Sequence, residues 1–252
     1  MPETDQLKKE HAVCLKLEVL ADAMLAGPFD LTSDYQRLAF AFASKSAKSY
    51  RAVLRLVENG LGEPALVLVR AVFDDLINLS YISTDPDRLA KLFLEFQLLE
   101  QKRYVDLWEE SGLEGHVEAE EIARLKAQWA VAKSDYEKVL PNYPKRTYWS
   151  GKNVKAMAAA IDPELAKTYR LLYPYASGFA HGGSPLALSS YVGQTEDMNL
   201  TSLAAPSDAE LSEALVAAFG LFSRCLRLFA SACEADKSGL DALNTEAEKT
   251  LS

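Results

Sequence analysis

The stretch that decides the fold is EPALVLVRAVFDDLINLSYI, residues 63–82. Pro64 suits the first turn of a helix, where a backbone N–H would have no helical partner in any case. The residues that follow, up to Phe73, are apolar on nearly every side of the expected helix, and Arg70 is the exception. A helix that is apolar all round belongs at the centre of a bundle, because only other helices can cover every side of it.

The flanking sequence shows helical period throughout, and strand patterns are nearly absent. Residues 153–181 are expected to form two short helices. Further long helices are expected at about residues 3–25, 33–60, 86–111, 117–140 and 207–235. The last of these opens with the capping-box pattern SDAE at residues 207–210. We expect a polar loop at residues 184–207 and a frayed polar tail at residues 237–252.

These patterns predict an all-α protein, a single helical bundle of about six long helices plus short helices. No repeat period and no low-complexity linker divides the chain, so residues 1–252 are expected to form one domain. The helix within residues 1–30 is expected to pack onto this bundle.

The composition limits the classes of partner. The chain of 252 residues has 27 lysines and arginines against 36 aspartates and glutamates, a formal net charge of −9 at pH 7. Duplex DNA binding needs a broad basic face, so it is not expected. The 3 cysteines suggest reduced thiols. With no signal-peptide pattern and no apolar run approaching the ~20 residues of a membrane span, we expect a cytoplasmic protein that avoids membranes.

Arg70 interrupts the most apolar helix. At about 100° per residue, Asp74, Asn78 and Tyr81 lie on the same side of that helix. Burying an unpaired guanidinium costs much free energy. Two interpretations are therefore open: a structural ion pair between Arg70 and Asp74, or a polar pocket inside the bundle.

His181 lies in YASGFAHGGSP, residues 175–185, at the end of an expected helix. Ser177 precedes it by four residues and lies on the same helix face. One interpretation is a buried core histidine whose hydrogen bonds are satisfied. The other is a general acid or base, or a contact to phosphate, with the two following glycines allowing a ligand to approach closely.

Residues 143–155 reverse the acidic charge locally. Lys145, Arg146 and Lys152 lie among aromatic residues that include Trp149, and the stretch contains no acid. Cations for phosphates and rings for stacking favour a contact to a nucleotide or single-stranded nucleic acid. The alternative is a surface loop that Trp149 anchors in the core.

Several common catalytic motifs are missing. The sequence contains no Cys-x-x-Cys, no His-Glu-x-x-His, no P-loop, no Gly-x-Gly-x-x-Gly and no Gly-x-Ser-x-Gly. We therefore expect neither a bound metal nor a cofactor.

Two stretches resemble an uncharacterised bacterial family known as domain of unknown function 5677. In GLGEPALVLVRAVFDDLINLSYI, the family's arginine followed four residues later by an acid, usually glutamate, corresponds to Arg70 and Asp74. In YPYASGFAHGG, its Ser-x-x-x-His element corresponds to Ser177 and His181. The resemblance covers about residues 35–230 and implies an all-helical fold, but no established activity.

A more distant resemblance is to the HEPN superfamily of helical nucleotide-binding proteins and ribonucleases, many of which act in toxin–antitoxin or phage-defence systems. Its catalytic motif is an arginine, four to six residues, then a histidine on one helix. This sequence departs from that motif, because the nearest arginine before His181 is Arg170. The cation would have to come from another helix, as Arg70 could.

We expect an internal polar site that binds a nucleotide or RNA, and in its enzymatic form a metal-independent ribonuclease of a toxin or phage-defence type. His181 would be the general acid or base at a ribose 2′-hydroxyl, Arg70 would stabilise the phosphate charge, and Asp74 would orient Arg70. The other residues expected to line the site are Asn78, Tyr81 and Ser177. The alternative is a non-enzymatic interaction module in which these groups form a structural network. A homodimer is also expected.

Overall fold

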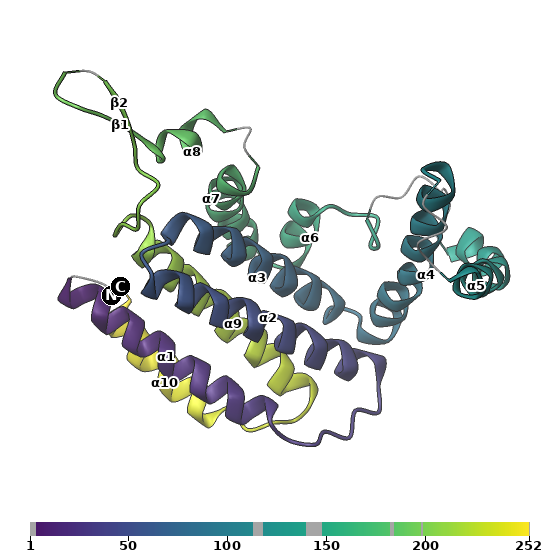
Figure 1. Ribbon diagram of the computed structural model, residues 1–252. Helices are drawn as coiled ribbons and strands as arrows, with labels where there is room; N and C mark the ends of the chain where they lie inside the picture. The colour runs from purple at the N-terminus through teal and green to yellow at the C-terminus, as the bar shows by residue number, and fades with distance from the viewer. Residues whose placement is uncertain (1–3, 113–117, 140–147, 182–183, 198, 252) are drawn as a thin grey trace. The chain divides into compact units, whose positions relative to one another are not determined.

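The computed structural model describes residues 4–112, 118–139, 148–181, 184–197 and 199–251, with only the backbone of residues 134–139 (Figure 1). Contacts divide the chain into two compact units, the first formed by Met1–Thr84 with Val154–Ser252 and the second by Asp85–Asn153. The expectation of one domain stays a prediction. The all-α fold is confirmed, since one short hairpin is the only sheet among the described residues.

Eight helices and the hairpin make up the described part of the first unit. They are α1 (Asp5–Leu25), α2 (Asp34–Glu58), α3 (Gly62–Ile82), α6 (Val154–Ile161), α7 (Pro163–Ala180), α8 (Pro185–Ser189), α9 (Leu211–Ala232) and α10 (Ser238–Thr250). The hairpin pairs β1 (Val192–Gln194) with β2 (Leu200–Ser202) in antiparallel register, Val192 opposite Ser202.

Helices α2, α3 and α9 run side by side and form the centre of the first unit (Figure 1). Most apolar side chains of α3, among them Leu66, Val72 and Leu76, are fully buried, as its sequence predicted. On another side, α3 contacts α6 and α7. Each fully buried side chain of this size contributes about 1.5–3 kcal/mol. The arrangement therefore leaves α3 little surface in contact with water.

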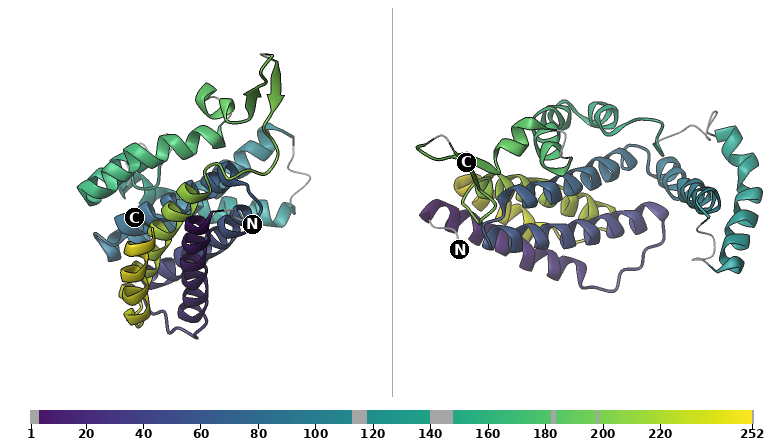
Figure 2. Two further views of the ribbon diagram at one scale, coloured as in Figure 1. Left: turned by 90° about the vertical axis from the view of Figure 1, so that its left-hand side faces the viewer. Right: turned by 45° about the horizontal axis from the view of Figure 1, so that its top comes forward.

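Helices α1 and α10 lie against each other at the side of the core (Figure 2). The tail that was expected to fray is therefore helical, which corrects the sequence interpretation. Leu240, Leu243 and Ala247 are buried, and Lys16 Nζ of α1 pairs with Glu246 Oε1 at 2.6 Å. The few apolar residues of this polar stretch share one helix face, which is enough to hold it once α1 offers a partner surface.

The start of α9 is a second correction. The capping-box pattern at residues 207–210 does not begin the helix, which starts at Leu211 with Glu210 in a left-handed conformation at φ 61° and no side-chain cap. Ser207 N donates instead to Gly60 O at 2.9 Å. The segment before α9 thus packs on the turn between α2 and α3, and this tertiary contact outweighs the local capping preference. The expected polar loop at residues 184–207 likewise contains α8 and the hairpin.

Helix α9 is, among the described residues, the one helix long and apolar enough to cross a membrane by length and composition. Glu213, Arg224 and Arg227 interrupt its apolar residues, and the expectation that the protein avoids membranes stays a prediction. Of its most apolar window, 61% is buried inside the protein. The core helix of a globular protein has the same properties, so this observation is weak support for a membrane span.

The described part of the second unit contains α4 (Pro86–Glu110) and α5 (Ala119–Val139), which contact each other. Val105 of α4 forms a small buried cluster with Ile122 and Leu125 of α5. Trp149 is also buried and meets Phe93 edge to face, with ring centroids 5.1 Å apart.

Two glycines, Gly62 at the start of α3 and Gly220 within α9, allow a matched pair of substitutions. A Cβ atom at Gly62 would lie 2.1 Å from Ala209 O, whereas a Cβ at Gly220, in the middle of α9, meets nothing within 4 Å. We expect Gly62→Ala to lower the free energy of unfolding by about 2 kcal/mol or more, and Gly220→Ala to raise it by about 0.5–1 kcal/mol. Urea unfolding followed by circular dichroism measures both. Equal effects would contradict the close packing at Gly62.

Candidate functional site

Three side chains from α3 and the end of α7 meet at one point. Arg70 Nη1 lies 2.9 Å from His181 Nε2, although the two residues are 111 positions apart. Arg70 Nη2 donates to Tyr173 Oη at 2.9 Å. Arg70 is half-buried and His181 is exposed. We call Arg70, Tyr173 and His181 the Arg70 cluster; the structure brings its arginine and histidine together as expected, and their roles stay predictions.

A four-residue repeat on α7 positions this cluster. Tyr169, Tyr173, Ser177 and His181 follow at intervals of four, so their side chains share one helix face. The rings of Tyr169 and Tyr173 stack with centroids 4.6 Å apart. The Arg70 guanidinium carbon lies 4.8 Å from the centroid of the Tyr173 ring, a cation–π contact. The sequence analysis missed both tyrosines, and this repeat was the signal that could have found them.

The donor and the acceptor of the Arg70–His181 contact follow from the chemistry of the two groups. A guanidinium carries donors only, so a hydrogen bond at this place requires His181 Nε2 as the acceptor. Such a hydrogen bond uses the tautomer that carries its proton on Nδ1.

The expected ion pair between Arg70 and Asp74 does not form. No described carboxylate pairs with Arg70, whose hydrogen-bond partners are the neutral Tyr173 and His181. The charge of Arg70 still acts on the Asp74 carboxyl, and the role of Asp74 in orienting Arg70 stays a prediction. Burial raises the pKa of Asp74 to about 6, although the charge of Arg70 acts to lower it. The effect of desolvation on the pKa of Asp74 is thus larger than the effect of the Arg70 charge.

The neighbouring acid, Asp75, is the one that is paired. Its carboxylate is buried and accepts hydrogen bonds from Lys45 Nζ and, at 3.2 Å, from Ser46 Oγ. Both partners, Lys45 and Ser46, lie on α2, which packs against α3. Periodicity placed Asp74 on the Arg70 face, but only the packing of α2 against α3 provides a cation for Asp75.

Three buried polar atoms beside the cluster have no hydrogen-bond partner among the described residues: Arg70 Nε, Asp74 Oδ1 and Ser177 Oγ. Buried polar atoms in native proteins normally have partners, and those without one often mark sites that bind a ligand or water. All three belong to residues that the sequence analysis assigned to the site.

Asn78 and Tyr81 are the other residues of α3 that were expected to line the site. Asn78 Nδ2 donates to Asp74 O at 2.8 Å, within the same helix. Tyr81 is half-buried, and its carbonyl oxygen accepts from Thr84 Oγ1 at 2.7 Å. Both lie on the expected helix, α3.

The basic stretch at residues 143–155 is only partly described. Lys145 and Arg146 lie outside the described residues. Trp149 is buried against Phe93 and so anchors this segment. This fits the second of the two interpretations, a surface loop anchored in the core. It does not fit the use of the Trp149 ring as a stacking surface for a ligand. Lys152 is exposed. These residues belong to the second unit, while the Arg70 cluster belongs to the first.

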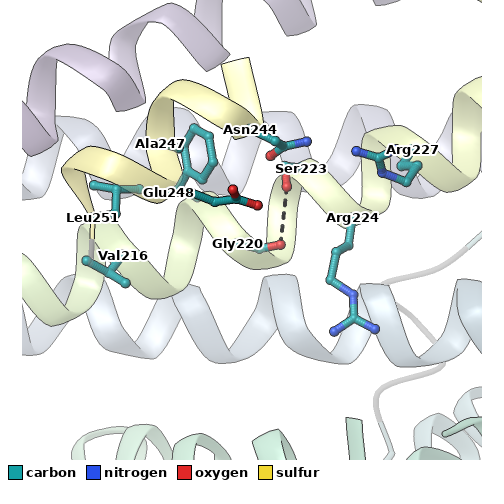
Figure 3. A pocket seen from close by; sticks show the side chains of 10 residues that line it. Val216, Gly220, Ser223, Arg224, Arg227, Asn244, Ala247, Glu248 and Leu251 are labelled. Atoms are coloured by element: carbon teal, nitrogen blue, oxygen red, sulfur yellow. Dashed lines mark hydrogen bonds between the residues drawn. The ribbon is translucent and has the colours of Figure 1, made fainter. Parts of the chain in front are cut away.

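A second basic feature lies in a groove of about 540 Å³ between α9 and α10. Arg224 and Arg227 line it but point in different directions (Figure 3). Arg224 pairs with Asp162 at 3.5 Å and Arg227 with Asp241 at 2.7 Å, and Glu248 lines the same groove. Their charges are already neutralised, so this groove suits an anion less well than the Arg70 cluster does. Among the described residues, no group of three or more His, Cys, Asp or Glu side chains could hold a metal ion.

The raised pKa of Asp74 makes its effect on stability depend on pH. Because the pKa of Asp74 in the folded state lies near 6, above its ordinary value of 3.8, the folded protein binds the proton more tightly, and the stability of the native protein falls as pH rises through this window. Asp74→Asn removes this effect. We expect the variant to match the native protein below about pH 4 and to exceed it by about 1–2 kcal/mol at pH 7, after allowing for partial exposure.

Urea unfolding at a series of pH values measures this difference, with the exposed Asp30→Asn as the control. A variant less stable than the native protein at pH 7 would mean that the Asp74 carboxylate is stabilised by its surroundings.

Comparison with known proteins gives one match. Residues 36–199 match a family described as "Family of unknown function (DUF5677)", a range that contains α3, α7 and the whole Arg70 cluster. No curated protein and no solved structure matches the chain, and nothing in the comparisons supports a relation to the HEPN superfamily. Because the match covers more than half of the chain, the protein belongs to the DUF5677 family, and this agrees with the resemblance seen in its sequence.

Proposed function

We propose that the Arg70 cluster binds the phosphate of a nucleotide or of single-stranded RNA. The observation that carries this proposal is the half-buried guanidinium of Arg70, which has two neutral hydrogen-bond partners and pairs with no described carboxylate. A charge withdrawn from water is costly unless an opposite charge meets it. A phosphate would supply that charge.

The geometry suits an anion that carries several acceptor oxygens. A phosphate oxygen can take the hydrogen bond that Arg70 Nη1 now gives to His181. The imidazole can then bind a proton on Nε2 and become a second cation beside the anion. The Tyr173 hydroxyl accepts from Arg70 and keeps its own hydrogen to donate. Because the ligand brings negative charge to the Arg70 guanidinium, binding is expected to be sensitive to salt.

In the enzymatic form of the proposal, His181 is the general base for RNA cleavage. Once a phosphate holds Arg70, the freed Nε2 takes the proton of the ribose 2′-hydroxyl. The 2′-oxygen then forms a bond to phosphorus, the bond from phosphorus to the 5′-oxygen breaks, and the leaving oxygen takes a proton from water. Arg70 stabilises the charge that develops on the phosphate oxygens. The step is of the metal-independent type, consistent with a toxin or phage-defence ribonuclease.

Binding is tested with a fluorescein-labelled single-stranded RNA of ten nucleotides in EDTA, followed by fluorescence anisotropy. Arg70→Met keeps a side chain of similar length without the charge, and it is expected to weaken binding about tenfold or more. Lys167→Met removes one charge from an exposed position of the same α7 and should leave affinity unchanged. Inorganic phosphate should compete. Equal affinity of the Arg70 variant and the native protein would reject the proposed site.

Cleavage is tested on the same RNA with His181→Gln. The glutamine amide oxygen can accept the hydrogen bond from Arg70 but cannot take up a proton, so RNA should still bind while cleavage falls about 100-fold or more. The melting temperature of the variant checks its folding. If the native protein binds RNA but leaves it intact, the enzymatic form of the proposal is wrong and the binding function stands.

One observation favours a second candidate, the interaction module. Large exposed apolar side chains occur along α7, α8 and the segment from β1 to just past β2: Leu171, Leu186, Leu188, Val192, Leu200 and Leu203. Exposed apolar surface often marks contacts between proteins, and a homodimer would cover it. In this case sedimentation gives the mass of a dimer and neither phosphate nor RNA binds.

A further inference from the structure

A cavity of about 470 Å³ lies where α7, α8 and the residue before α9 meet. Its apolar walls include Tyr175 and Phe179 of α7 and Leu186 and Ala187 of α8, and Glu210 contributes a carboxylate. The rings of Tyr175 and Phe179 meet edge to face, with centroids 5.4 Å apart. A volume of this size suits a small organic molecule.

The cavity and the Arg70 cluster lie on different faces of α7. The cluster uses Tyr173 and His181, which follow the four-residue repeat, whereas the cavity uses Tyr175, Gly178 and Phe179. At about 100° per residue these two sets point away from each other. A ligand in the cavity would therefore not occupy the Arg70 cluster.

The carboxylate of Glu210 is the unusual group of this cavity. Its Oε2 atom is buried and has no hydrogen-bond partner, and no described lysine, arginine or histidine pairs with it. Tyr175 lies beside this carboxylate: burial, a hydrogen bond between its hydroxyl and Glu210, and the charges of Glu210, Glu213 and Glu63 all raise the pKa of Tyr175. Glu63 is only 8% exposed. The surroundings of the cavity are thus negative, with no cation among the described residues to balance them.

We propose that this cavity binds a protonated organic amine with an apolar body. The ammonium group would face the Glu210 carboxylate, which lines the cavity. The apolar body would pack against Tyr175, Phe179 and Leu186, and the ring faces add a cation–π attraction for the charged end. An organic acid of the same size would be repelled, and a neutral analogue would gain only the apolar contact.

Isothermal titration calorimetry with three probes of similar shape tests this proposal: 2-phenylethylamine, 2-phenylethanol and 3-phenylpropionate. The native protein is expected to bind the amine about tenfold or more tightly than the alcohol, and the acid not measurably. Glu210→Gln should reduce amine affinity about tenfold and leave the alcohol unchanged. Glutamine makes the same backbone demand as glutamate at φ 61°, so the variant should fold, which its melting temperature checks.

Two further variants complete the experiment. Glu164→Gln removes an exposed carboxylate from the first turn of α7, outside the cavity, and should leave amine binding unchanged. Arg70→Met should also leave it unchanged, so this proposal and the phosphate proposal can fail separately. Equal binding of amine and alcohol, or an unaltered amine affinity in Glu210→Gln, would overturn the amine site.

Discussion

The structure depends on the burial of α3. Its side chains are apolar on nearly all sides, so the helix is stable only where α2 and α9 cover one part of it and α6 and α7 another. This constraint decides where its few polar groups go. Asp75 faces α2 and is neutralised there by Lys45, whereas Arg70 faces α7 and meets a histidine and a tyrosine. The core and the candidate site are thus two consequences of one packing requirement.

Both proposed sites rest on the same physical argument. Each holds a charge that is partly withdrawn from water and that forms no salt bridge with a described residue. At the Arg70 cluster the charge is positive and its hydrogen bonds go to neutral groups. At the cavity the charge is the Glu210 carboxylate, one oxygen of which has no partner. Several other charges of the first unit are paired, as with Arg227 and Asp241 at 2.7 Å. The contrast with those pairs draws attention to these two places, because unbalanced charge is what a ligand of opposite sign can stabilise.

Sequence reasoning located the arginine and the histidine but left the role of their neighbours open. One of its two interpretations paired Arg70 with Asp74, because these residues share a face of one helix, whereas the hydrogen bonds of Arg70 go to Tyr173 and His181. For Trp149 it allowed a contact to a ligand or an anchor in the core, and the burial of the ring against Phe93 fits the anchor. Spacing along a helix shows which side chains can point the same way, and it contains no information about what the next helix presents to them.

The sequence by itself determined the helical class, most helix boundaries and the central place of α3, because periodicity and end signals act within one segment of chain. Only the tertiary structure decided that residues 70 and 181 meet, that Asp75 rather than Asp74 is paired, that residues 238–250 are helical, and that α9 begins after its capping motif. Each of these depends on contacts between segments far apart in the chain. The free energy of such contacts outweighs local preferences of about 1 kcal/mol, and it cannot be computed from either segment alone.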